Sequence, residues 1–206
     1  MEASTASATW NARVVSYEIE HSDGQKDFYE GEKGAERLVC VEFPTGWRRI
    51  YEGEKGAERI VRIERSNGKL LFYEGEQGAE RKVRVEFPNG HKDFYEGDKG
   101  EERYVRFEYP NGDKEFYEGE KDEERKVRVF VFFDGSIEFY EGEMDAERKV
   151  RAELFGGIKT FYEGEMDAER LVCLEFSDGR KKFYEGEKGA ERLVRIFRPG
   201  RILWKI

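Results

Sequence analysis

Short stretches of alternating apolar and polar residues recur along the chain. The stretch from Arg37 to Phe43 is one of them, and its period of two is typical of a half-buried β-strand. A turn signal, Pro-Thr-Gly at 44–46, follows at once, and a second short run leads into Tyr-Glu-Gly at 51–53. Because no stretch shows the 3.6-residue period of a helix, the pattern predicts a β-hairpin followed by a short connector.

This hairpin unit is repeated in tandem. The triplet Tyr-Glu-Gly occurs eight times with a spacing of 22 residues, which lengthens once to 23. The single extra residue lies within the run 126–134. Eight copies in fixed phase indicate a repeat architecture, in which neighbours together bury a surface that one hairpin cannot bury alone. The triplet defines two structural columns, the tyrosines Tyr29, Tyr51, Tyr73, Tyr95, Tyr117, Tyr140, Tyr162 and Tyr184 and the glycines Gly31, Gly53, Gly75, Gly97, Gly119, Gly142, Gly164 and Gly186.

The repeats predict an all-β fold. We expect an elongated open stack of eight β-hairpin repeats of 22–23 residues, forming a twisted antiparallel sheet or solenoid. Three regions are expected: an N-terminal tail and capping strand at 1–24, the repeats at 25–200, and a C-terminal capping strand at 201–206. The first cap is a degenerate strand at 13–20 that ends in a turn at 22–24. Caps are needed because an open sheet edge exposes unpaired N–H and C=O groups.

The type of hairpin turn decides which side chains share a face. In a type I turn followed by a left-handed glycine, Pro88 occupies the second position, where its fixed φ fits. This turn pairs Val83 with Tyr95 and predicts that the valine and tyrosine columns share one face. The phenylalanine column then lies on the other face, under the stems of Arg84 and Lys82. The alternative is a two-residue Asn-Gly turn. It would shift the pairing of the two strands by one residue and so exchange the faces on which these columns lie.

The connector carries glycine or aspartate at one fixed position. Because these residues replace each other where the backbone is left-handed or tightly turned, we expect such a conformation there. A calcium loop is not expected, since its ligands would recur at alternate positions. The residues at this position are Gly34, Gly56, Gly78, Gly100 and Gly189 in five repeats and Asp122, Asp145 and Asp167 in three.

Composition agrees with a thin fold. Charged residues make up 40% and apolar residues 37%, too few apolar residues for a thick core, whereas 15% aromatic residues argue against disorder. The net charge of −9, with both signs interleaved, predicts no nucleic-acid partner and disfavours a membrane partner. No apolar run has transmembrane length and Met1 to Trp10 lacks a signal-peptide pattern, so we expect a cytoplasmic protein.

Two sets of repeated residues have both a functional and a structural interpretation. The tyrosine column could stack bases or sugars, or each ring could cover the backbone of a glycine, as Tyr51 could cover Gly53. The glutamate and arginine columns, represented by Glu30, Glu36 and Arg37, could suggest acid–base or metal chemistry. An active site is singular, however, so eight equivalent copies indicate a ladder of cross-strand ion pairs.

No catalytic, metal or cofactor site is expected. Cys40 and Cys173 occupy one register six repeats apart, which is too far for a disulfide if the stack is straight. His21 and His91 are remote from them, so no metal-ligand set forms. Neither a Ser/His/Asp arrangement nor a phosphate-binding glycine loop occurs. We therefore predict a protein that is not an enzyme and needs no cofactor, with free thiols that fit a reducing compartment.

The Tyr-Glu-Gly-Glu block, followed by a strand ending in Phe-Pro-Asn-Gly, resembles the MORN repeat, a tandem β-hairpin with a Tyr-x-Gly signature. The resemblance covers about 28–200. MORN units usually carry an aromatic residue four positions after the tyrosine and a His-Gly-x-Gly stretch. Here the first position holds residues such as Lys33 and Met144, and the stretch is absent. YD-type repeats of toxin shells are a weaker match.

The MORN resemblance implies scaffolding, protein–protein contact or membrane-proximal attachment. We expect a non-catalytic repeat scaffold or rigid spacer that binds a protein partner, or a second copy of itself. The alternative is a membrane-surface or phosphoinositide-binding module of the MORN type. A contiguous apolar strip would favour the protein partner, and a strip of arginine and lysine would favour lipid.

Overall fold

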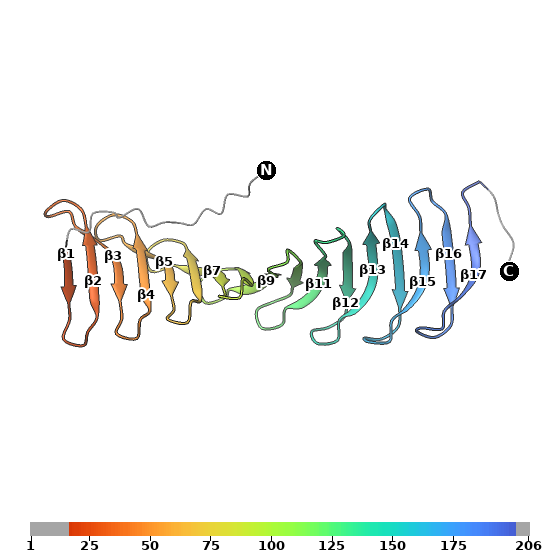
Figure 1. Ribbon diagram of the computed structural model, residues 1–206, viewed down its shortest axis with the longest axis horizontal. Helices are drawn as coiled ribbons and strands as arrows, with labels where there is room; N and C mark the ends of the chain where they lie inside the picture. Colours follow the sequence, from red (N-terminus) through yellow and green to blue (C-terminus); the bar gives the residue numbers. More distant parts are fainter. Residues whose placement is uncertain (1–16, 201–206) are drawn as a thin grey trace. The chain divides into compact units, whose positions relative to one another are not determined.

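Seventeen β-strands and no helix make up residues 17–200, the part of the chain that the computed structural model describes. These residues form two units, 17–88 and 89–200. Within each unit the strands lie side by side in chain order as a single layer (Figure 1). The predicted C-terminal cap at 201–206 and the first sixteen residues lie outside the described part, so of the N-terminal cap only β1 and its turn are seen.

The strands of the first unit are β1 (Tyr17–Glu20), β2 (Lys26–Glu30), β3 (Arg37–Glu42), β4 (Arg48–Glu52), β5 (Arg59–Glu64), β6 (Leu70–Glu74) and β7 (Arg81–Glu86). Those of the second unit are β8 (Lys92–Glu96), β9 (Arg103–Glu108), β10 (Lys114–Glu118), β11 (Arg125–Phe130), β12 (Ile137–Glu141), β13 (Arg148–Leu154), β14 (Ile158–Glu163), β15 (Arg170–Glu175), β16 (Lys181–Glu185) and β17 (Arg192–Phe197).

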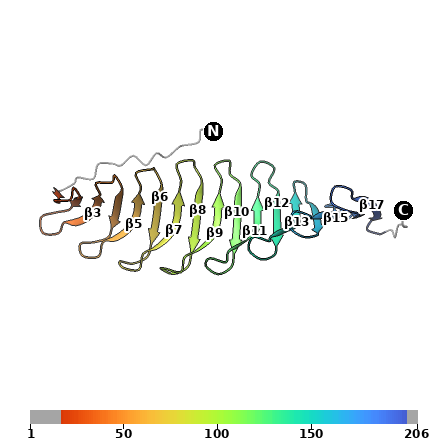
Figure 2. The same cartoon turned by 90° about the horizontal axis from the view of Figure 1, so that it is seen from below.

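Each strand pairs antiparallel with the next strand of its unit. The pairing runs from β1 to β7 in the first unit and from β8 to β17 in the second. Figure 2 shows the same succession of strands from another side. Among the described pairings none closes the first strand of a unit onto its last. The predicted all-β, open antiparallel stack of hairpin repeats is therefore confirmed.

Five described hairpin turns, at 21–24, 43–46, 65–68, 109–112 and 176–179, have the predicted type, whereas the turn at 154–157 differs because Gly156 also has a positive φ. The carbonyl oxygen of Phe43 accepts a hydrogen bond from the Gly46 N–H at 2.8 Å, and the Phe43 N–H donates to Trp47 at 2.9 Å. Pro44 therefore holds the second position of a type I turn, and Gly46 follows with a φ of +79°. The one longer repeat places its extra residue in a wider turn, in which the Gly135 N–H donates to Val131 and the Val131 N–H donates to Ser136.

A β-bulge at the connector end of each repeat changes the predicted faces. Phe28 lies opposite Cys40, whereas its neighbour Tyr29 lies opposite Leu38, so Val39 is an extra residue on its strand. A bulge of this kind turns two successive side chains toward one face. The valine column therefore lies with the phenylalanine column, and the prediction that it shares the tyrosine face is wrong. Counting residues from the turn alone cannot reveal the bulge.

The bulge also separates the two basic positions that were expected above phenylalanine. Arg84 lies over the ring of Phe72 at 4.0 Å, as predicted. Lys82 lies opposite Tyr73 and therefore belongs to the tyrosine face, contrary to the prediction. In the second unit the equivalent Lys126 places its ammonium group 4.7 Å from the ring of Tyr140.

The connector is a tight turn with a left-handed residue, as predicted. Asp122, Asp145 and Asp167 have φ values of 61–66° and are the only residues other than glycine with positive φ in 17–200. The glycine of the triplet has a separate requirement. A Cβ on Gly53 would lie 2.4 Å from the carbonyl oxygen of Ala57, so the connector backbone, rather than a tyrosine ring, is what lies closest to this glycine.

Six connectors within the two units are each linked to the preceding repeat by a carboxylate. Glu58 accepts a hydrogen bond from Gly56 at 2.8 Å within its own connector, and another from the Leu38 N–H of the preceding repeat at 3.2 Å. Leu38 adjoins the bulge at Val39. The same link recurs at Ile60, Tyr104, Lys126, Lys149 and Leu171. At these six junctions a repeat holds its predecessor through a charge-assisted bond to the backbone.

Two basic columns add further links between neighbours. Arg37 pairs with Glu30 in its own repeat and donates to the carbonyl oxygen of Gly53 in the next repeat at 2.8 Å. Lys55 donates back to the carbonyl oxygen of Gly34 at 3.1 Å. These contacts include the predicted cross-strand ion pairs, but many of them end on backbone carbonyls. They matter because the apolar core is thin: Val85 and Ala152 are the most buried apolar residues described.

The glycine of the triplet should tolerate no side chain. We expect Gly53→Ala to lower the free energy of unfolding by about 3 kcal/mol or more, through the close approach to Ala57 and the strained φ of +118°. Gly56→Ala is the matched control, because nothing lies within 4 Å of a Cβ at this position. Its only cost is the left-handed φ of the new alanine, which should lower the free energy of unfolding by about 1 kcal/mol. Urea unfolding measures both. Equal midpoints would contradict the described connector.

The linking carboxylate should make the stack sensitive to acid. Burial raises the pKa of Glu58, but hydrogen bonds from its own N–H, Leu38 and Gly56, together with Arg37, outweigh this and hold the pKa below 4.5. The stabilisation is therefore complete above pH 4.5 and is lost as the pH falls through the lowered pKa. We expect Glu58→Gln to cost about 1 kcal/mol at neutral pH and to make the acid loss of stability shallower.

Glu54→Gln provides the control for this measurement, because Glu54 is exposed in the same connector. Its unfolding midpoint should match the unmodified protein at every pH. An acid profile that Glu58→Gln leaves unchanged would show that the link does not stabilise the stack.

Candidate binding groove on the phenylalanine face

The phenylalanine face carries a regular stack of rings and guanidinium groups. Within the second unit the stacked pairs are Phe94 with Arg106 at 3.8 Å, Phe116 with Arg128 at 4.1 Å, Phe139 with Arg151 at 3.9 Å and Phe183 with Arg195 at 4.1 Å. The members of each pair lie opposite each other on adjacent strands, because the hairpin register places them there. Each guanidinium is thereby held in place by a ring, as in cation–π contacts.

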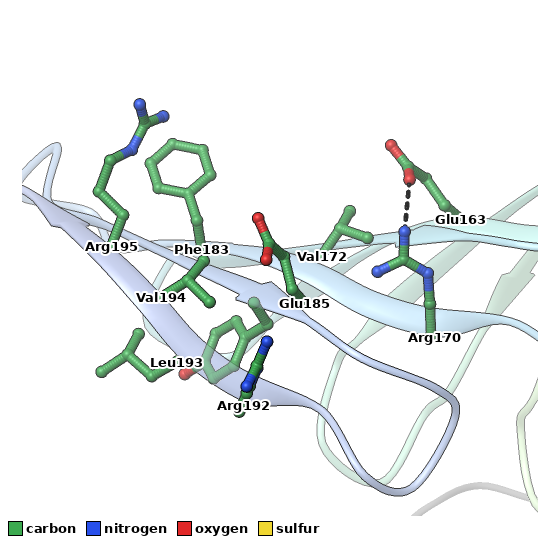
Figure 3. A pocket seen from close by; sticks show the side chains of 10 residues that line it. Glu163, Arg170, Val172, Phe183, Glu185, Arg192, Leu193, Val194 and Arg195 are labelled. Atoms are coloured by element: carbon green, nitrogen blue, oxygen red, sulfur yellow. Dashed lines mark hydrogen bonds and ion pairs between the residues drawn. The ribbon is translucent and has the colours of Figure 1, made fainter. Parts of the chain in front are cut away.

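Shallow hollows lie between successive stacks of this face. Three of them, of about 820, 480 and 540 Å³, occur in the second unit. Each is lined by valines of the bulge column, by one or two phenylalanines, by one tyrosine of the triplet, and by arginines and glutamates. In Figure 3, Val172 lies between Phe183 and the ion pair of Glu163 with Arg170. The bulge, which turns the valines to this face, is what gives the hollows their apolar part.

Two of the hollows are contiguous. The hollow that begins at Glu96 and the one that ends at Phe161 share three lining residues, Glu118, Val127 and Phe139. Together they form what we call the phenylalanine-face groove, which crosses the strands from β8 to β14. Its polar wall includes the ion pair of Arg103 with Glu96 at 3.4 Å.

Most stacked arginines have a carboxylate partner two residues further along the strand. Arg106 pairs with Glu108 at 3.2 Å and Arg151 with Glu153 at 3.5 Å. Phe130 replaces this glutamate after Arg128, and Phe197 replaces it after Arg195. Within 17–200, neither Arg128 nor Arg195 forms an ion pair. Both lie in a hollow, so each of these two hollows contains a guanidinium without an ion-pair partner among the described residues.

The predicted tyrosine column lies on the opposite face. The hydroxyl of Tyr95 donates to Asp93 at 3.3 Å, and the hydroxyl of Tyr104 donates to the other oxygen of the same carboxylate at 3.4 Å. The ring of Tyr104 contacts that of Tyr117, with centroids 4.7 Å apart. Burial and the neighbouring carboxylates raise the pKa of all three tyrosines. At neutral pH these hydroxyls are protonated donors to carboxylates on their own face.

The two cysteines are free and differ in burial. Burial raises the pKa of Cys40 to about 11, and it also raises the pKa of Cys173. Because the thiolate is the reactive form, neither environment activates the sulfur at neutral pH. Both cysteines stand where other repeats place the stacked arginine; Cys173, for example, lies opposite Phe161.

Residues 17–200 contain no group of three or more His, Cys, Asp or Glu side chains placed to hold a metal ion. Over the same residues, no helix is long and apolar enough to cross a membrane. No protein-family model and no curated protein matches the chain.

The hollows themselves were not expected from the sequence, because the bulge that forms them was not. One signal was nevertheless present in the repeats. The replacement of glutamate by Phe130 and by Phe197 marks the two repeats in which the stacked arginine lacks its partner.

The tyrosine face should respond to alkaline pH. Burial and then Asp93 raise the pKa of Tyr95 from 10.0 to about 12. A raised folded pKa means that the stabilisation is complete below pH 10.0 and is lost as the pH rises toward about 12. We expect Asp93→Asn to shift the tyrosinate absorbance titration to lower pH. The control is Asp98→Asn in the exposed connector; an equal shift in both variants would contradict the described contact.

Proposed function

We propose that the chain is a non-catalytic scaffold that binds a protein partner along its phenylalanine face. The observation that supports this is the repetition of one kind of hollow, with the same residue types, at three places in the second unit, two of them in successive repeats. Catalysis needs one arrangement of groups that differs from its surroundings. Repeated equivalent hollows suit a ligand that is itself extended and contacts several repeats.

The chemistry of the groove fits a protein ligand. Aromatic and arginine side chains contribute much of the energy at protein interfaces, where charged rims surround apolar contacts. Here phenylalanine and valine provide the apolar contacts, and Arg103, Arg106 and Arg128 provide fixed donors. Because the stacked guanidinium groups are already held by rings, little side-chain entropy is lost when a partner binds. The resemblance to MORN repeats implies the same class of function.

The alternative function, attachment to a membrane surface through phosphoinositides, has less support. Anionic head groups require clustered positive charge. Glutamates line every hollow described, and the chain carries a net charge of −9. A protein partner satisfies this mixture of charges and apolar surface better than a lipid surface does.

Affinity capture with paired variants tests the proposal. The intact chain should retain specific proteins from a native cytosolic extract, and Val127→Glu, which places a charge in the shared part of the groove, should reduce their recovery at least about tenfold, a loss of 1.4 kcal/mol. Lys126→Glu places the same residue on the tyrosine face and should leave recovery unchanged. Arg128→Glu places the same charge at an exposed position of the groove and should also reduce recovery. Because Arg128 is exposed, this loss would not come from a folding defect.

Flotation with phosphoinositide vesicles at ~150 mM salt, where the Debye length is about 8 Å, completes the test. If the Val127→Glu and Lys126→Glu variants reduce the recovery of captured proteins equally, binding by the phenylalanine face is contradicted. Co-flotation that Arg128→Glu abolishes, without any retained protein, would favour the membrane alternative.

A further inference from the structure

We infer that the phenylalanine-face groove takes an acidic peptide in the polyproline II conformation, with an apolar side chain in each hollow. This inference rests on the proposed function and specifies the partner's chemistry. It depends on three properties of the groove: the spacing of its hollows, the aromatic rings that border them, and the charge of the stacked arginines.

The spacing of the hollows matches one turn of a polyproline II helix. Val105, Val127 and Val150 occupy the same position in successive repeats and line the two contiguous hollows. Successive positions are two strands apart, and strands in a sheet lie about 4.8 Å apart, which gives about 9.6 Å. A polyproline II helix has three residues per turn and rises about 3.1 Å per residue, or about 9.3 Å per turn. Every third side chain therefore meets the next valine.

Other regular conformations do not repeat in this way. A β-strand covers nearly the same distance in three residues, but its side chains alternate between faces, so consecutive hollows would receive side chains from opposite faces. An α-helix rises about 5.4 Å per turn, and its side chains fall out of step with a spacing of about 9.6 Å. Of these three conformations, the threefold one matches the spacing of the hollows most closely.

The rings fit the same ligand. Phe116 and Phe139 border the hollows, and each is backed by a guanidinium that keeps it in position. Grooves lined by aromatic side chains are a recurrent way of binding polyproline II segments, because these segments are already extended and lose little entropy when they bind.

One guanidinium of the groove, that of Arg128, favours an acidic peptide. The hollow around Arg128 is lined by three arginines and two glutamates. Arg106 is already paired with Glu108, whereas Arg128 has no carboxylate among 17–200 because Phe130 stands in its place. A carboxylate of the ligand can form a two-point contact with this guanidinium, which the ring of Phe116 holds ready.

The length of the ligand is limited by the same residues. To contact all three valines, the ligand needs an apolar side chain at every third position, that is, at three positions within a segment of seven residues. Beyond Phe161 the pattern changes, because Cys173 takes the place of the stacked arginine. The twist between strands, about 20–25° per strand, also rotates successive hollows and favours a short segment.

Synthetic peptides test the inference with the intact chain. The probe is four repeats of Leu-Pro-Glu, which combines the threefold period with negative charge. One comparison peptide replaces every Glu by Lys, and a second repeats Leu-Pro-Pro-Glu, which changes the period to four. We expect calorimetric titration to show that the first peptide binds at least about tenfold more tightly than either comparison peptide.

Two variants of the protein locate the contact. Arg128→Gln should weaken binding of the Leu-Pro-Glu peptide about tenfold. Arg84→Gln is the matched control: Arg84 stacks on Phe72 in the first unit and is already paired with Glu86, so binding should not change. Thermal unfolding of both variants verifies that they remain folded.

Each result bears on the inference. Equal affinity for the two periods would overturn the spacing argument, and equal affinity for the lysine peptide would overturn the charge argument. If no peptide binds while captured proteins are still lost with Val127→Glu, the scaffold function stands and the partner has a different chemistry. If neither peptides nor proteins bind, the proposed function fails as well.

Discussion

The structure depends on one hydrogen-bonding problem, the satisfaction of backbone N–H groups next to the β-bulge. A bulge interrupts the ladder between two strands, and in a single-layer sheet no second layer is present to provide acceptors. The N–H of Leu38, which adjoins the bulge residue Val39, finds its acceptor in Glu58 of the next repeat. The carboxylate also closes its own connector through Gly56. One side chain therefore shapes a turn, completes a strand pairing and joins two repeats.

This arrangement explains why so charged a chain can build an ordered sheet. The described core is thin, and few apolar side chains are fully withdrawn from water. Stability that a globular protein would draw from a thick core is drawn here from bonds between charged side chains and backbone groups, repeated at six junctions within the units. Charge-assisted bonds to the backbone are stronger than exposed ion pairs between two side chains, which contribute little. The same arrangement turns the valine column toward the rings and so creates the hollows.

The sequence predicted the strands, the type I turn and the left-handed connector, because each has a local signal. Alternation marks the strands, Pro-x-Gly marks the turn, and the exchange of Gly56 for Asp122 marks the connector. It did not predict the bulge, because a bulge depends on how two strands meet rather than on any one residue. The placement of Val83 and Lys82 was therefore wrong, while that of Arg84, on the turn side of the bulge, was right. The groove was missed for the same reason.

The longer repeat shows where this architecture accepts change. Its additional residue lies in the turn between Val131 and Ser136, and the strands on both sides keep their register. The opposite ends of the hairpins cannot absorb an insertion in this way, since each connector must reach both its own turn and the repeat before it. The fold therefore has one permissive edge and one conserved in length. Foreign loops could be grafted along the turn edge, one per hairpin, to build an evenly spaced display surface.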